Sequence, residues 1–161
     1  MEFEGEYLNG RKYNGKGFDE KGNIIYELKN GNGKVKEYDS MNNIIFEGEY
    51  LNGERNGKGI EYYWNGELEF EGEYLNGERW NAKGFNNNGI LEFEIINGNG
   101  KVKEYYDNGK LKFEGEYLNG IRNGTGKEYY DNGEISFEGE YLNGKRHGKI
   151  YDYSNECLIF W

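Results

Sequence analysis

Aromatic and charged residues alternate along much of this chain. The segment 70–74, Phe-Glu-Gly-Glu-Tyr, is typical, and its period of two predicts a β-strand with unlike faces instead of a helix. Phe70, Gly72 and Tyr74 should point to one face, and the intervening glutamates to the other. The central glycine leaves space for a neighbouring ring to cross close to the backbone.

This segment belongs to a longer string, Phe-Glu-Gly-Glu-Tyr-Leu-Asn-Gly, that occurs five times. Two degenerate copies lie in the longer gaps, and a shift of the sequence by 67 residues superposes the copies without any insertion. We interpret residues 1–161 as a single array in which a block of three repeats was duplicated. The copies begin near Phe3, Tyr26, Phe46, Phe70, Phe93, Phe113 and Phe137.

Asparagine–glycine pairs follow the strands at regular intervals, and both residues tolerate the positive φ that tight hairpins need. Consecutive strands should therefore pair antiparallel, with about thirteen strands in all, including a terminal strand at 157–161. We predict an all-β fold, an elongated single-layer antiparallel β-meander built from about six to seven repeated β-hairpins. The pairs stand at 9–10, 52–53, 65–66, 76–77, 108–109, 119–120, 132–133 and 143–144.

The copies at Tyr26 and Phe93 differ from the others. Leu28 and Ile95 replace the central glycine, and the internal turns are shorter by about four residues. We expect these copies to notch one long edge of the sheet, with the notches recurring at an interval of 67 residues.

Composition favours a folded array over disorder. The chain has 27 Gly and 31% charged residues, but it also has 16 Tyr, 9 Phe and 3 Trp, and disordered chains are poor in aromatic residues. Each well-buried ring contributes roughly 2 kcal/mol. Aromatic rings should therefore supply most of the buried apolar surface.

The segments 46–59 and 113–126 fit the pattern aromatic-x-Gly-x-aromatic-x-x-Gly-x-x-x-Gly-x-Gly. They resemble the MORN repeat (membrane occupation and recognition nexus), and the resemblance covers essentially the whole chain. Glu-Tyr-Tyr-Asp-Asn-Gly at 128–133, with similar sequence at 104–109, is more similar to the bacterial MORN variant. We expect the repeat glycines and tyrosines to be structural: Gly5, Gly48, Gly72, Gly115, Gly139, Tyr7, Tyr50, Tyr74, Tyr117 and Tyr141.

Candidate catalytic and metal-binding residues are few. His147 is the only histidine, and its position in a repeat turn favours an exposed loop residue over a general base. The Gly-Asn-Gly-Lys segments at 31–34 and 98–101 lack the spacing of a phosphate loop, and the Asp-Asn-Gly segments at 107–109 and 131–133 lack the order of a calcium loop. We predict no catalytic, metal or cofactor site, and therefore no enzyme.

Charge guides the choice of partner. Thirty acidic and 20 basic residues give a net charge of −10, which should repel anionic membranes and nucleic acids. The sequence shows no membrane-spanning run and no leader, and its lone Cys157 fits a reducing compartment, so we expect a cytoplasmic protein. The candidate partner-binding residues are the outward glutamates Glu47, Glu49, Glu71, Glu73, Glu114 and Glu116.

Two functional hypotheses remain. The first is a non-catalytic protein-binding or scaffold module that holds a basic partner on an extended acidic and aromatic sheet. The alternative is a bacterial antitoxin or phage-borne inhibitor that neutralises a basic or nucleic-acid-binding enzyme. The uncapped terminal strands also predict self-association, with the strand at 157–161 as the favoured contact.

Overall fold

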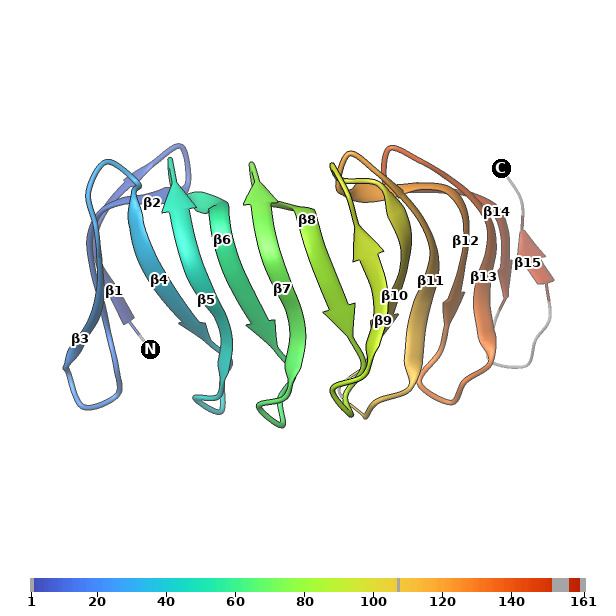
Figure 1. The fold of residues 1–161 in the computed structure, drawn as a ribbon, viewed down its shortest axis with the longest axis horizontal. Helices are drawn as coiled ribbons and strands as arrows, with labels where there is room; N and C mark the ends of the chain where they lie inside the picture. The colour runs from blue at the N-terminus through green and yellow to red at the C-terminus, as the bar shows by residue number, and fades with distance from the viewer. Residues whose placement is uncertain (1, 107, 152–156, 160–161) are drawn as a thin grey trace. The chain divides into compact units, whose positions relative to one another are not determined.

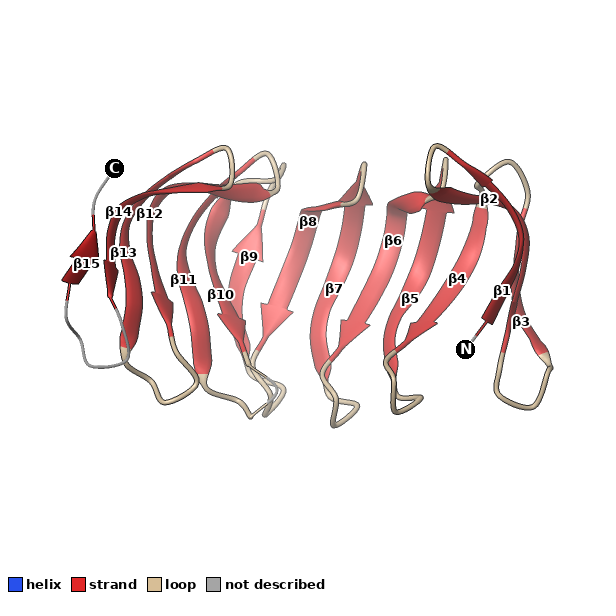
Figure 2. Cartoon of the chain, turned by 180° about the vertical axis from the view of Figure 1, so that it is seen from behind, coloured by secondary structure: helices blue, strands red, loops and turns tan. Residues whose placement is uncertain are grey.

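A computed structural model of the chain describes residues 2–106, 108–151 and 157–159. The chain divides into two compact units, Met1–Arg79 and Trp80–Trp161, and each is considered by itself. Within the described residues, both units consist of strands joined by turns, without a helix (Figures 1 and 2).

The first unit contains seven complete strands and the start of an eighth. Each strand pairs antiparallel with its neighbour in sequence in the order β1-β2-β3 and then β4-β5-β6-β7. The strands are β1 (Glu2–Leu8), β2 (Arg11–Phe18), β3 (Ile24–Leu28), β4 (Gly33–Tyr38), β5 (Ile44–Leu51), β6 (Glu54–Tyr62), β7 (Leu68–Leu75) and β8 (Glu78–Phe85).

The second unit begins within β8 and continues the same pattern. β8 pairs with β9, and β10 to β15 pair in sequence order. The strands are β9 (Leu91–Ile95), β10 (Gly100–Tyr105), β11 (Leu111–Leu118), β12 (Ile121–Tyr129), β13 (Ile135–Leu142), β14 (Lys145–Tyr151) and β15 (Cys157–Ile159). The prediction of an all-β antiparallel meander of hairpins is therefore confirmed.

The number of strands differs from the sequence-based expectation. The described residues contain fifteen strands, whereas about thirteen were expected. The difference arises because each of the seven copies, including the one at Phe137, forms two strands, and β15 follows them. The expected terminal strand is described only over Cys157–Ile159; positions 160–161 lie outside the described residues.

The degenerate copies, for which shorter turns and a notched sheet edge were expected, have short strands. β3 and β9 have five residues each, whereas β5, β7, β11 and β13 have eight. A feature that the sequence did not predict accompanies the shortening: only an isolated bridge links each short strand to the strand that follows it, Lys29↔Asn32 in the first unit and Ile96↔Asn99 in the second. The sheet ladder is therefore interrupted after β3 and after β9.

Hydrogen bonds between successive turns hold the hairpins side by side within each unit. Asn52 has φ 54° and donates its N–H to Oδ1 of Asn32 at 3.0 Å, while the Gly53 N–H donates to the Gly31 carbonyl at 2.9 Å. The residues 67 positions later repeat this arrangement in the second unit. Left-handed backbone favours Asn and Gly, so Asn-Gly pairs of this kind close their turn and join it to the turn before. At 65–66 and 132–133 only the glycine has positive φ, and its N–H bonds within its own turn.

Candidate functional site

One face of the sheet in each unit is built from buried phenylalanine rings. Phe46, Phe70, Phe113 and Phe137 have no exposed surface. Each ring is covered by the guanidinium group of an arginine from the next strand, with distances of 4.1 Å for Arg55 on Phe46 and 4.0 Å for Arg122 on Phe113. Arginine stacks well on aromatic faces, so this aromatic face is closed by charged groups instead of by a second layer.

A bend in the strand brings the arginine over the ring. The β5–β6 pairing shifts register between Gly48 and Tyr50, and Gly57 lies near the shift with φ 90°. In a straight strand, the six-residue separation of Arg55 and Glu61 would span about 20 Å. Instead, Nη1 of Arg55 lies 3.3 Å from a carboxylate oxygen of Glu61, so β6 folds back over its own face. β12 repeats this geometry with a register shift, a φ of 91° at Gly124, and an Arg122–Glu128 ion pair.

The arginines form a ladder with glutamates and tyrosines. Arg55 donates to both carboxylate oxygens of Glu37, at 3.1 and 2.9 Å, and the Tyr50 hydroxyl donates to the same carboxylate at 2.5 Å. Because Arg55 also pairs with Glu61, one guanidinium group joins two successive repeats. In the second unit, Arg122 joins Glu104 and Glu128 in the same way.

The ladder fixes the protonation of its members. Burial would raise the pKa of Glu61, but Arg79 and Arg55 outweigh burial and lower that pKa to about 2. Burial and the charge of Glu61 raise the pKa of Tyr74, which donates its hydroxyl hydrogen to that carboxylate. At neutral pH the glutamate is therefore ionised and the tyrosine is protonated, which suits a structural role and not proton transfer.

Sequence reasoning missed these ladder residues. The signal was present, because in four full copies an arginine follows the repeat tyrosine by five positions and a glutamate precedes it by thirteen. His147 was expected in an exposed loop. It is exposed, but it lies in β14 opposite Glu140, because the final hairpin continues its ladder through this position.

The structural glycines and tyrosines proposed from the sequence differ in burial. Tyr74 and Tyr141 are buried, Tyr50 and Tyr117 are half-buried, and Tyr7 is 58% exposed. Gly5, Gly48, Gly72, Gly115 and Gly139 lie in the strands β1, β5, β7, β11 and β13. A side chain at Gly48 would collide with the Phe46 ring, so this glycine provides the space in which the ring packs.

The opposite face of the sheet is polar and carries the six candidate glutamates. Most of them lie directly across from lysines. Glu47 pairs with Lys36 at 3.2 Å, whereas Glu71 lies across from Ile60. The other positions are Glu49 across from Lys34, Glu73 from Lys58, Glu114 from Lys103 and Lys127, and Glu116 from Lys101. This face is therefore a lattice of alternating charge.

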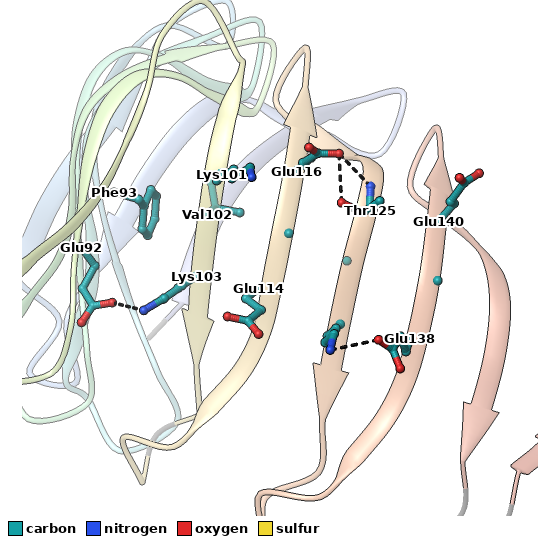
Figure 3. A pocket seen from close by; sticks show the side chains of 14 residues that line it. Glu92, Phe93, Lys101, Val102, Lys103, Glu114, Glu116, Thr125, Glu138 and Glu140 are labelled. Carbon is teal, nitrogen blue, oxygen red and sulfur yellow. Dashed lines mark hydrogen bonds and ion pairs between the residues drawn. The ribbon is translucent and has the colours of Figure 1, made fainter.

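A hollow lies on the polar face of each unit. The hollow in the second unit has a volume of about 580 Å³ and is drawn in Figure 3. Its floor includes the backbone of Gly115, Gly126 and Gly139, and rows of lysines and glutamates flank it. The equivalent hollow in the first unit, 67 residues earlier, has a volume of about 440 Å³. The two hollows run across strands and are lined mainly by side chains that carry charge.

The described residues show neither a metal cluster nor a membrane-spanning helix. In that part of the chain, no three His, Cys, Asp or Glu side chains are grouped so that they could hold a metal ion. None of the described residues forms a helix with the length and apolar character needed to cross a membrane.

Repeated hairpins, four of which close an aromatic core with an arginine, define a β-hairpin repeat protein. The profile of the MORN repeat matches residues 46–67, 113–135 and 137–149, and that of the MORN repeat variant matches residues 98–119. These segments of the chain are MORN repeats. A comparison with curated proteins gave no significant match. MORN repeats are generally modules that bind proteins or membranes, and the family is generally non-enzymatic.

Proposed function

We propose that this chain is a non-catalytic protein-binding module whose partner docks on the polar face of the sheet. The observation that carries the proposal is the closure of the opposite face, where Phe46 and Phe113 lie fully buried beneath arginines. A partner that approaches the sheet broadside therefore meets the face that carries the glutamates.

Tyrosines add aromatic surface to this polar face. The Tyr129 hydroxyl donates to Glu114 at 2.6 Å, and the Tyr105 hydroxyl donates to Glu92 at 2.7 Å. Both tyrosines are half-buried, so their rings can contact a partner while their hydroxyl groups hold glutamates in place. Tyrosine is favoured at protein interfaces because it offers apolar area and a polar tip together.

The charge of the chain selects the partner in this proposal. Lysines offset much of the local charge on the polar face, but the net charge of −10 remains. A protein with a basic surface would be attracted over about 8 Å at physiological salt. Binding should weaken as salt rises, mainly through slower association.

Charge reversal tests the proposal. Glu71→Lys with Glu73→Lys should weaken capture of the native partner from a host extract and preserve the fold. The matched control, Glu20→Lys with Glu67→Lys, changes the net charge equally at exposed positions in or beside turns. Equal binding by the two double variants, or binding of anionic liposomes by the parent, would refute docking of a basic protein on the polar face. We also expect no turnover of nucleotides, esters, glycosides or nucleic acids by the purified protein.

A further inference from the structure

The two units differ at one position in a row of charged side chains on the polar face. In the first unit, Lys58 lies between Glu49 and Glu73 in this row. The corresponding residue of the second unit, 67 positions later, is Thr125, which lies between Glu116 and Glu140. The row in the second unit therefore keeps both glutamates and lacks the lysine between them.

The backbone around this position is the same in both units. The Lys58 N–H donates to Oε2 of Glu49 at 3.0 Å. The Thr125 N–H donates to Oε2 of Glu116 at 2.8 Å, and the Thr125 hydroxyl lies 3.2 Å from the same oxygen (Figure 3). A lysine would fit at position 125, because the same strand geometry holds one at position 58. What the second unit lacks is the ammonium group.

The hydrogen bonds from Thr125 also stabilise the ionised form of Glu116. The N–H of Thr125 has the largest effect in lowering the pKa of Glu116, and the Thr125 hydroxyl lowers it further. Glu116 is therefore ionised at neutral pH. Alternate strands of a sheet are about 10 Å apart, so a cation above Thr125 would lie between Glu116 and Glu140.

The larger hollow surrounds this position. All three residues, Glu116, Thr125 and Glu140, line it, and its volume of about 580 Å³ exceeds the 440 Å³ of the hollow that contains Lys58. The glycine backbone of the floor would allow an extended chain to approach the sheet closely. The hollow crosses several strands, so such a chain would lie across them.

We propose that the hollow of the second unit receives a lysine or arginine side chain from an extended segment of the partner, and that its cationic group takes the place that Lys58 holds in the first unit. This inference rests on the proposed function and names the docking position. Charge complementarity specifies the occupant, and the first unit supplies an internal example of the same arrangement.

The test uses the full chain labelled with ¹⁵N and a peptide of alternating glycine and lysine as the probe. Titration should shift the amide signals of Glu116, Thr125 and Glu140 more than those of Glu49, Lys58 and Glu73. A peptide in which norleucine replaces lysine keeps the four-carbon chain without the ammonium group and should give no such shifts. Equal shifts in the two rows, or equal shifts with the norleucine peptide, would overturn the proposal.

Two substitutions at the site sharpen the test. Thr125→Lys places the protein's own ammonium group between the glutamates and should weaken peptide binding by about fivefold or more. Thr125→Ser keeps the hydroxyl and the empty place, and should bind like the parent. Thermal unfolding of both variants establishes that they are folded. Unchanged peptide binding by Thr125→Lys would reject the site.

The reciprocal substitution in the first unit should create a second binding position for the peptide. Lys58→Thr should create a second row with an empty cation place, so peptide-induced shifts should appear at Glu49 and Glu73. The docking position and the proposed function fail in different ways. Capture of the native partner by Thr125→Lys at the parental level would reject only the docking position, whereas capture by the Glu71→Lys, Glu73→Lys variant at the level of its control would reject the proposed function.

Discussion

A methyl group added at Gly115 should destabilise the second unit strongly. The β-carbon of Gly115→Ala would lie 2.6 Å from Cζ of Phe113, 2.7 Å from the carbonyl oxygen of Thr125 and 2.8 Å from Cα of Gly126. Carbon atoms in contact are normally about 3.5–4.0 Å apart. The ring could turn aside, but the other two contacts are backbone atoms of the adjoining strand, so relief requires β11 and β12 to separate.

Overpacking of this kind typically costs 1–3 kcal/mol. Because two of the three collisions at Gly115 are with backbone, we expect about 3 kcal/mol, the upper end of that range. For a chain of this length, each kcal/mol lowers the thermal midpoint by about 2–4 °C. The expected loss is therefore roughly 6–12 °C, measured by circular dichroism and checked by urea unfolding.

Two controls separate crowding from other effects. Gly133 has φ 92°, and among the described residues beyond its chain neighbours no heavy atom lies within 4 Å of its added β-carbon. Gly133→Asn should therefore cost less than about 1 kcal/mol, since asparagine tolerates left-handed backbone. Glu116→Gln keeps an oxygen acceptor on the polar face and should also cost less than about 1 kcal/mol. If Gly115→Ala unfolds at the same temperature as Glu116→Gln, the packing argument is wrong.

The ladder and the turns give three further predictions. Glu61→Gln should lower the free energy of unfolding by about 3 kcal/mol at pH 7. The pKa of Glu61 in the folded protein is about 2, below its ordinary value of 4.5, so the difference in stability between variant and parent, measured by urea unfolding, should disappear as pH falls from 4.5 to 2. A difference that persists at pH 2 would contradict a stabilising role for the ionised carboxylate. Arg122→Lys should lower stability by about 2 kcal/mol through lost stacking and paired hydrogen bonds, whereas a thermal midpoint equal to the parent's would show that charge alone suffices. The Asn143 N–H donates to Oδ1 of Asn123 at 3.1 Å, and Asn123→Ala removes this acceptor. The variant should lose about 1 kcal/mol of stability, and the Asn143 amide should exchange its hydrogen faster. Asn123→Asp keeps an acceptor, so the Asn143 amide should stay protected from exchange.

Hairpins and face assignments could be predicted from the sequence because they depend on local rules. The alternation at 70–74 predicts one buried and one exposed face, and in the structure Phe70 and Tyr74 are buried while Glu71 and Glu73 are exposed. The Asn-Gly turns need only a positive φ, which a residue type can signal. The duplication was visible as a 67-residue shift and reappears in the structure as two copies of the same contacts.

The recurrence of arginine and glutamate marks the ladder residues in the sequence, but their contacts and the hollows could not be predicted, because these depend on bends and register. Nothing in a period of two indicates that β6 folds back at Gly57, so the contact between Arg55 and Glu61 was invisible. The interruption after β9 likewise depends on how far pairing extends beyond the turn at Asn97. The candidate glutamates were placed correctly in strands by pattern, but their lysine neighbours required the register between strands.

The two units, set side by side in sequence, distinguish residues that the fold requires from residues that differ between the copies. The units share one fold, so residues that the fold requires should recur after 67 positions, and the ladder does recur: Glu37, Arg55 and Glu61 correspond to Glu104, Arg122 and Glu128. On the polar face the copies diverge, with Ile25, Lys58 and Ile60 replaced by Glu92, Thr125 and Lys127. These replacements change the charge that lines each hollow while the strands beneath stay the same. Because the shared core does not dictate them, we propose that they are the positions at which the two units recognise different chemical groups.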